Sequence, residues 1–151
     1  MPTAWRLIKT RYVDSAWDGE AARRAGGRWN SPGTAVVYTS ATLALALVEV
    51  LVHLRSDVLP TFTAIPVEFE ASMVAALTRP ELPRDWKATP PPSSTMVLGD
   101  RWVESGRSVA LKVPSVVVPT EHNYVLNPAH TDFRRLRIGT PTAFPFDERL
   151  R

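Results

Sequence analysis

The chain of 151 residues is 44% apolar and 22% charged. This balance excludes an intrinsically disordered chain and indicates one globular domain, predicted over residues 1–151. The absence of cysteine excludes disulfides, a thiolate metal site and a thiol nucleophile. The net charge of +3 comes from scattered lysines and arginines, and so small a surplus does not by itself indicate nucleic-acid binding.

The N-terminal stretch lacks the pattern of a targeting segment. Charges interrupt residues 1–15, so the apolar run typical of a signal peptide does not form. The longest apolar run, 43–54, contains a glutamate and is shorter than the roughly 20 residues of a membrane-spanning helix. We therefore expect a cytoplasmic protein without a membrane segment.

The first half of the chain is predicted to form two strands and one strong helix. Strands are expected at 4–9 and 35–40, and the Gly, Asn, Ser and Pro residues over 26–33 predict a loop between them. Apolar residues recur with helical spacing over 43–54. This helix is apolar nearly all round, so we expect it to be buried centrally.

The second half is predicted to consist mainly of short strands, because many of the 14 prolines of the chain fall there. A strand is expected at 61–70, and its proline places it at a sheet edge; a long loop at 80–94 and a short helix at 94–105 follow. The segment 108–119 is expected to form two strands separated by a break. A turn-bounded strand after residue 121 and a last strand near 133–138 complete the chain. A loop as long as 80–94 often covers a site. Helices and strands mix without βαβ regularity, which predicts an α+β fold in a single compact domain.

Glu49 is the only charge between Ala41 and Val52. A buried carboxylate is costly unless it is paired or hydrogen-bonded, so Glu49 either faces a solvent window or has a polar partner. The apolar surroundings favour a carboxylate that faces a cleft and has a partner. His53 follows one helical turn later, but no third ligand stands at a recognisable spacing, so we expect no metal and a structural histidine that bonds Glu49 or a backbone carbonyl.

Arg28 and Ser115 are the other two candidate residues, and only Arg28 has two readings. Arg28 stands in a glycine-rich loop, where an arginine either ties the loop to carbonyls or faces an anion that the glycines allow to approach. The spacing of the residues does not decide between these two roles of Arg28. Ser115 follows a proline at a strand break, where a serine usually satisfies a local backbone group. No nucleophile turn of the G-x-S-x-G kind is present, so a Ser-His-Asp triad is not indicated.

Three segments together carry a family resemblance. They are GGRWNSPGTAVVYTS at 26–40, ALVEVLVHL at 46–54 and ALKVPSVVVPTEHNYVLNPAH at 110–130. In order and spacing they resemble the motifs of the RES-domain family, the toxins of Xre-RES toxin–antitoxin pairs, named for an arginine, a glutamate and a serine. The resemblance covers essentially the whole chain and implies a fold similar to ADP-ribosyltransferases of the diphtheria-toxin type.

The resemblance also implies the site and its substrate, NAD, with no further cofactor. Arg28, Glu49 and Ser115 match the name-giving residues and are the expected catalytic group, while Tyr38 matches the active-site tyrosine of the family. Further substrate-binding residues expected in the same motifs are Trp29, Asn30, His53 and Asn127.

General chemistry agrees with these implied roles. Cleavage of the nicotinamide–ribose bond passes through an oxocarbenium-like state, which a carboxylate such as Glu49 stabilises. A guanidinium grips phosphate oxygens bidentately, as expected of Arg28, and Tyr38 is suited to stack on nicotinamide. Ser115 is then expected to hydrogen-bond the ribose or to orient Arg28.

The resemblance implies an Xre-type helix-turn-helix antitoxin as partner, with DNA contacted only indirectly through it, and leaves open a homodimer within that complex. Reported activities of the family divide between NAD degradation, by water or phosphate, and transfer of ADP-ribose to a protein. A third reading, a non-catalytic interaction or nucleic-acid-binding module, gives no reason for a carboxylate within an apolar helix. The sequence does not choose the acceptor of the ADP-ribose.

Overall fold

The computed structural model describes residues 1–55 and 59–150. The α-helices are α1 (Glu20–Ala25), α2 (Leu43–Leu51) and α3 (Ser93–Ser105). The strands are β1 (Thr3–Lys9), β2 (Val37–Ser40), β3 (Phe62–Glu68), β4 (Val74–Ala76), β5 (Ala110–Pro114), β6 (His122–Leu126), β7 (Arg137–Ile138) and β8 (Thr142–Phe144). Short 3-10 helices stand at Thr10–Ser15, Ala71–Met73, Arg79–Glu81, Thr131–Arg135 and Glu148–Leu150. Among these described residues, no helix has the length and apolar character needed to cross a membrane.

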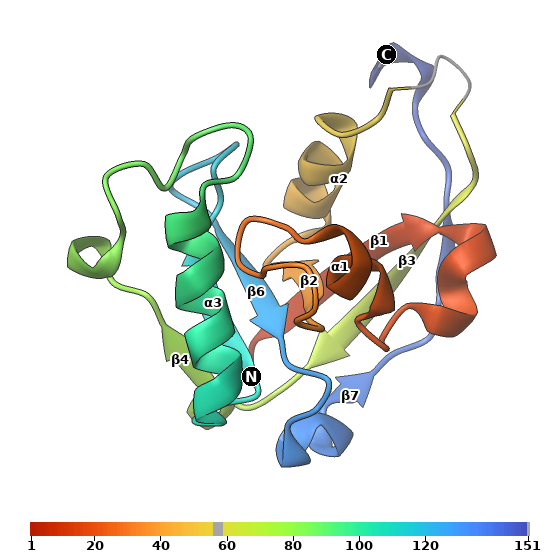
Figure 1. The fold of residues 1–151 in the computed structure, drawn as a ribbon. Coiled ribbons are helices and arrows are strands. Elements are labelled where there is room, and N and C mark those ends of the chain that lie inside the picture. Colours follow the sequence, from red (N-terminus) through yellow and green to blue (C-terminus); the bar gives the residue numbers. More distant parts are fainter. Residues whose placement is uncertain (56–58, 151) are drawn as a thin grey trace.

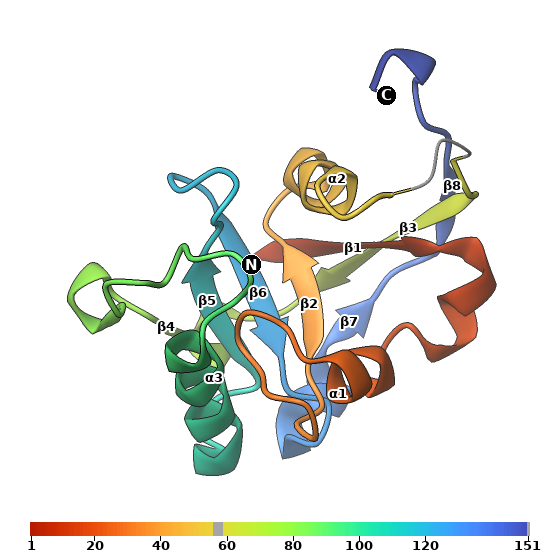
Figure 2. The same ribbon diagram turned by 45° about the horizontal axis from the view of Figure 1, so that its top comes forward.

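The described strands form one curled, mostly antiparallel sheet (Figures 1 and 2). Their order is β4-β5-β6-β2-β1-β3-β7. β8 also pairs with β3, at residues 62–64, whereas β7 pairs with β3 at residues 67 and 68. The β4–β5 pair is parallel, and the other described pairs are antiparallel. The predicted α+β class, without βαβ regularity, is confirmed.

One face of the sheet carries both α2 and α3. Trp5, Ser40, Asn123 and Val113 stand opposite one another across β1, β2, β6 and β5, and directly opposed residues share a face. On this face α2 packs over β1 and β3, and Trp102 of α3 packs over β5 and β6. Figure 2 shows the two helices beside these two parts of the sheet. Ser40 and Asn123 therefore lie on the stretch of sheet between the two helices.

The opposite face is covered in part by the chain that follows β6. Apolar side chains of β2, β3 and β6 on that face, among them Val37, Val67 and Leu126, form a cluster with Leu136. Phe133 of the 3-10 helix Thr131–Arg135 packs against the same cluster. The sheet is thus enclosed on both faces, and its polar residues between α2 and α3 are held in a rigid frame.

The expected edge position of the strand at 61–70 is wrong. β3 has β1 on one side and β7 and β8 on the other. The carbonyl of Pro66 accepts a hydrogen bond from the N–H of Gly139, just past β7, at 2.8 Å. The N–H and C=O positions of one residue point to the same side of a strand, so the nitrogen of Pro66 also faces the break between β7 and β8. No described strand pairs with β3 at that break, so the missing N–H of proline removes no hydrogen bond of the sheet.

The helix predicted over 43–54 ends earlier and is less buried than expected. The structure has α2 over Leu43–Leu51, with the Thr42 side chain accepting from the N–H of Leu45 at 3.1 Å as its N-cap. Leu45 and Ala46 are buried, but Val52, just past the end, is 55% exposed. Central burial is therefore wrong, because α2 lies on one face of the sheet and its outer side faces away from it.

Two further strand predictions need correction. β5 ends at Pro114, and 115–121 forms a turn instead of the second strand expected within 108–119. The N–H of Glu121 donates to the carbonyl of Val118 at 2.9 Å, so this backbone is bonded within the turn. The strand expected near 133–138 is a 3-10 helix over Thr131–Arg135 followed by the short β7.

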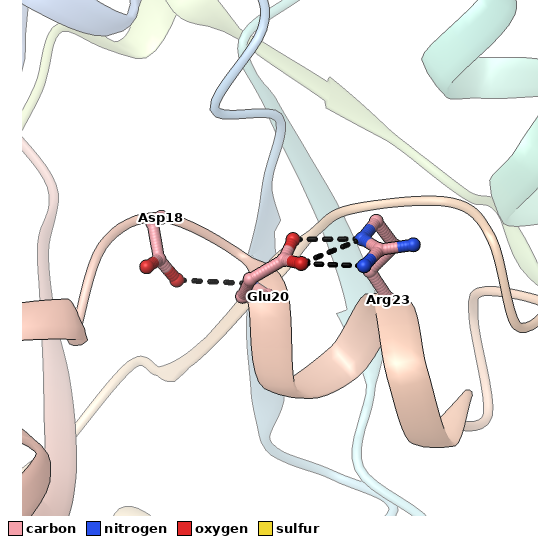
Figure 3. Close-up of polar contacts among 3 residues, drawn as sticks. All are labelled: Asp18, Glu20 and Arg23. Carbon is pink, nitrogen blue, oxygen red and sulfur yellow. Dashed lines mark hydrogen bonds and ion pairs between the residues drawn. The ribbon is translucent and has the colours of Figure 1, made fainter.

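α1 is a short helix that supplies hydrogen-bond acceptors to the loop after it. Asp18 accepts from the N–H of Glu20 at 2.9 Å, and Glu20 pairs with Arg23 one turn later (Figure 3). The Arg23 carbonyl accepts from the N–H of Gly33 at 2.7 Å. The Glu20–Arg23 ion pair is exposed and contributes little to stability. The contribution of α1 to the fold is therefore its carbonyl groups, which hold the glycine-rich loop.

Candidate active site

Glu49 has polar partners on both carboxylate oxygens. Ser115 donates its hydroxyl to Oε1 at 3.2 Å, and the side-chain amide of Asn123 donates to Oε2 at 3.0 Å. Glu49 comes from α2, while its two donors come from the end of β5 and from β6. The predicted polar partner of Glu49 is therefore confirmed, while the residue itself is half-buried. A carboxylate held through both oxygens has a fixed plane.

The Ser115 hydroxyl is fully used by this arrangement. Its oxygen accepts from the N–H of Val117 at 3.1 Å and of Val118 at 3.0 Å, while its proton goes to Glu49. Ser115 is 0% exposed. A hydroxyl carries one donor and two acceptor positions, so none is left over. The expectation that a serine here satisfies local backbone groups is met, and a nucleophilic role has no support in this geometry.

Asn123 is a site residue that the sequence analysis missed. Its side-chain oxygen accepts from the Ser40 hydroxyl at 2.7 Å, while its amide nitrogen donates to Glu49. The sequence held one indication, since Asn123 stands in an apolar strand on the same face as Val125, where a buried amide needs partners. Nothing in the local pattern linked it to residues as far away as Glu49, because that link depends on strand order.

The Arg28 guanidinium is anchored on one side only. Nη1 donates to the carbonyls of Trp86 at 2.9 Å and Ala88 at 2.7 Å, in the proline-rich segment before α3. A guanidinium has five N–H groups. Nε and Nη2 of Arg28 have no hydrogen-bond partner among the residues that the structure describes, so the edge they form is available. That edge has the geometry of a bidentate phosphate or carboxylate contact. Both sequence readings of Arg28 are therefore compatible with one side chain, which ties two loops and still presents a free edge.

The loop that bears Arg28 is braced by the phenol of Tyr38. Its hydroxyl accepts from the N–H of Trp29 at 3.0 Å and donates to Oδ1 of Asn30 at 2.6 Å. A Cβ on Gly27 would lie 2.7 Å from the same hydroxyl, so this close approach requires glycine. Burial raises the pKa of Tyr38, which keeps the phenol protonated and able to donate to Asn30.

Trp29 and Asn30 lie inside the fold. The Trp29 side chain is 3% exposed and packs in a core cluster with Trp86 and Trp102. Asn30 is 0% exposed, and its amide nitrogen donates to the carbonyls of Ala22 at 2.8 Å and Thr34 at 2.9 Å. These contacts brace the loop. The predicted contacts of Trp29, Asn30 and Tyr38 with a substrate stay predictions.

α3 holds the same loop from the other side. The backbone of Gly99 lies so close to the carbonyl of Trp29 that a Cβ built on Gly99 would be 1.6 Å from that oxygen. The neighbouring Asp100 accepts from the N–H of Ser31 at 2.9 Å. The position of Arg28 is therefore set by α1, β2 and α3 together, which explains why a loop can present a side chain in one place.

Arg28 and Glu49 interact electrostatically. Burial lowers the pKa of Arg28, while Coulombic attraction to Glu49 opposes that shift. The ion pairs formed by described residues lie elsewhere, so the two charges are within range without a direct contact. A ligand that bridges them meets a cation at one end and an anion at the other.

His53 and Asn127 are not part of this group. The His53 side chain is exposed in the turn after α2, where it lines an open hollow with Lys9, Arg11 and Arg55. Glu49 bonds Ser115 and Asn123 and not His53, so of the two partners expected for His53, Glu49 or a backbone carbonyl, the first is wrong. Asn127 follows β6 at the end away from Asn123, where it accepts from the N–H of Ala129 at 3.0 Å as a turn residue. Their predicted substrate contacts stay predictions.

Within the described ranges, no three histidine, aspartate or glutamate side chains gather in a way that could hold a metal ion. The residues around Glu49 offer hydroxyl and amide donors instead. Hydroxyl and amide groups of this kind orient a carboxylate by hydrogen bonding.

The chain as a whole matches a known family of proteins. The sequence pattern of the RES domain matches residues 3–147, and the chain therefore belongs to the RES-domain family. The resemblance seen in the three motifs is confirmed. "Toxin Res" of Yersinia enterocolitica is 40% identical over 149 residues, which cover 97% of this chain and 98% of that protein. "Prs ADP-ribosylating toxin" of a Sphingobium strain is 36% identical over 152 residues, which cover 97% of this chain and 94% of that protein.

The fold is also shared with a solved structure. One chain of the crystal structure of the M. tuberculosis MbcT-MbcA toxin-antitoxin complex superposes with a TM-score of 0.73 at 19% identity, covering 94% of this chain and 83% of that chain. This likeness confirms the α+β fold. The relative named an ADP-ribosylating toxin agrees with the predicted similarity to ADP-ribosyltransferases.

Proposed function

We propose that this protein is the toxin of a toxin–antitoxin pair and that it cleaves NAD at the nicotinamide–ribose bond. The observation that carries the proposal is the arrangement of Glu49, fixed through both carboxylate oxygens by Ser115 and Asn123, within Coulombic range of Arg28. Relatives named as toxins, one of them as ADP-ribosylating, support the class of function.

In the proposed reaction the bond between nicotinamide and C1′ of the ribose breaks, and its electron pair leaves with the nicotinamide nitrogen. The ribosyl group passes through an oxocarbenium-like state, whose positive charge the Glu49 carboxylate stabilises. An oxygen of the acceptor then bonds C1′ and loses its proton. The free Nε and Nη2 edge of Arg28 binds a phosphate of the pyrophosphate and fixes the ribose relative to Glu49.

The acceptor is water or phosphate in this proposal, so the cell loses NAD and growth stops. Transfer of ADP-ribose to a protein is the second candidate, and the name of the Sphingobium relative favours it. Both need the same polar group. A module that only binds a partner gives no reason for a carboxylate held by two donors.

The test is a product analysis. Purified protein is incubated with NAD alone, with phosphate, and with cell extract, and the products are identified by mass spectrometry. ADP-ribose indicates water as acceptor, ADP-ribose 1″-phosphate indicates phosphate, and a protein with an added ADP-ribosyl mass indicates transfer. NAD that stays intact under all three conditions would contradict the proposal.

The proposed partner is a helix-turn-helix antitoxin that covers the Arg28 and Glu49 group in the cytoplasm and makes the DNA contacts of the complex. The modest charge of +3 agrees with weak, salt-sensitive DNA binding by the isolated chain. Co-expression with such a helix-turn-helix antitoxin is expected to restore growth and the NAD level. Full NAD turnover by the purified complex would rule out neutralisation by coverage of the site.

A further inference from the structure

Asn123 stands at a junction of three elements. It is the second residue of β6 and is opposed by Ser40 of β2 on one side and by Val113 of β5 on the other. Asn123 is 9% exposed, and its side-chain amide donates a hydrogen bond to Glu49 of α2. Asn123 therefore connects the sheet to the helix that carries the carboxylate.

The orientation of the Asn123 amide follows from the chemistry of its partners. An ionised carboxylate only accepts hydrogen bonds, whereas a hydroxyl either donates or accepts. The amide nitrogen must therefore face Glu49, and the amide oxygen must face Ser40, as the distances of 3.0 Å and 2.7 Å have it. Ser40, which is 5% exposed, fixes this orientation because its proton is directed at Oδ1.

The two donors to Glu49 differ in what else they do. Ser115 is held by the turn after β5, since its oxygen accepts from Val117 and Val118. Asn123 has no such backbone bond to its side chain among the described residues and depends on Ser40 instead. Loss of the Asn123 side chain removes one hydrogen bond to Glu49 and leaves the turn after β5 intact. Loss of the Ser115 side chain removes a hydrogen bond to Glu49 and also the bonds that hold this turn.

We propose that Asn123, oriented by Ser40, is a positioning residue that sets the plane of the Glu49 carboxylate for the reaction. The inference rests on the proposed cleavage of NAD at Glu49. Asn123 acts through Glu49: its amide is enclosed in the sheet, and the hydrogen bond directs Oε2 without adding a charge. A carboxylate in the wrong rotamer stabilises the developing charge less, while the binding of NAD through Arg28 is unaffected.

The experiment measures kcat and KM for nicotinamide release by Asn123→Ala and Ser40→Ala. Asn123→Ala is expected to lower kcat about 10- to 100-fold, as for loss of a hydrogen bond to a charged group, with KM within about 2-fold. Ser40→Ala keeps the amide but frees its orientation, so kcat is expected to fall about 2- to 10-fold. The matched control is Thr39→Val, a buried hydroxyl of the same strand on the opposite face, with kcat within about 2-fold of wild type.

Asn123→Asp gives a readout that a purely structural role would not change. It places a second carboxylate beside Glu49, and two close carboxylates retain a shared proton to higher pH. Arg28, on the facing loop, interacts electrostatically with Glu49, and it is unchanged in this variant. The acidic limb of the kcat profile is therefore expected to move to higher pH in Asn123→Asp but not in Asn123→Ala.

Wild-type kcat in folded Asn123→Ala would overturn the inference, as would a change confined to KM. If Asn123→Ala does not fold, Ser40→Ala decides, and wild-type kcat in that variant overturns it equally. Failure of the proposed function looks different: either wild-type protein releases no nicotinamide, or Glu49→Gln is fully active.

Discussion

The backbone of Gly99 in α3 lies against the backbone carbonyl of Trp29, and a Cβ at Gly99 would be 1.6 Å from that oxygen. The helix and the loop that carries Arg28 are therefore packed backbone to backbone. Trp29 cannot withdraw easily, because its N–H is bonded to the Tyr38 hydroxyl at 3.0 Å. Any side chain at position 99 must displace the loop or the helix.

Gly99→Ala tests this packing. Alanine is favoured over glycine in a helix interior by about 1 kcal/mol, but the clash with a fixed carbonyl costs about 3 kcal/mol or more. We therefore expect a net loss of stability in thermal unfolding and lower NAD cleavage through displacement of Arg28. The matched control in the same helix is Glu104→Ala, an exposed position expected to change stability by about 0.5 kcal/mol at most. A Gly99→Ala protein as stable as wild type would show that the loop yields.

Tyr38→Phe tests the phenol that braces the same loop. It leaves the N–H of Trp29 and Oδ1 of the enclosed Asn30 without their partner, at a cost of about 1–3 kcal/mol each at most. The matched control is Tyr124→Phe on the other face, whose ring packs against Phe69 and whose hydroxyl has no hydrogen bond among the described residues. We expect Tyr38→Phe to lower stability and activity and Tyr124→Phe to leave activity near wild type. Equal effects of both variants would contradict a bracing role.

The raised pKa of Tyr38 gives a pH dependence with a defined sign. In the unfolded chain the phenol loses its proton near pH 10, whereas burial keeps it protonated to higher pH in the folded protein. The folded state therefore binds more protons above about pH 10, and stability falls as pH rises there, by up to about 1.4 kcal/mol per pH unit. The measurement is the unfolding free energy of wild-type protein and of Tyr38→Phe between pH 9 and 11. The difference between the two proteins isolates the contribution of Tyr38, and a difference that does not change with pH would contradict the prediction.

Arg28→Lys tests the phosphate contact expected of the Arg28 guanidinium. Lysine keeps the charge but loses the planar fork, so it cannot hold two carbonyls with one edge and a phosphate with the other. We expect the Kd for NAD to rise about 10-fold, equivalent to about 1.4 kcal/mol, in calorimetric titration of a catalytically impaired background such as Glu49→Gln. Unchanged affinity would restrict Arg28 to its contacts with Trp86 and Ala88.

Much of the first half of the fold could be predicted from local pattern. Alternation at 4–9 gives β1, the run at 35–40 gives β2, and the isolation of Glu49 in an apolar helix predicted its polar partner. The three motifs predicted the family, which the match over 3–147 confirms. These features depend on neighbours in sequence, which a single chain displays directly.

The rest depends on contacts between distant segments. Pro66 lies inside the sheet because β7 and β8 leave a break opposite it, and no local rule locates that break. The β-branched run after Ser115 forms a turn because the serine oxygen takes two of its N–H groups. Asn123 reaches Glu49, and Ser40 reaches Asn123, only through the arrangement of β2, β6 and α2 in the fold, so the sequence carries no sign of their role.

The most direct test of the account is nicotinamide release by wild-type protein and Glu49→Gln, followed by proton NMR in phosphate buffer at equal concentrations. Glutamine keeps the shape of Glu49 but removes its charge and places an amide N–H₂ against Ser115 or Asn123, since both oxygens of the acid accept. We predict release by the wild type and a rate at least about 10²-fold lower in folded Glu49→Gln. A folded Glu49→Gln protein that releases nicotinamide at the wild-type rate would contradict the account.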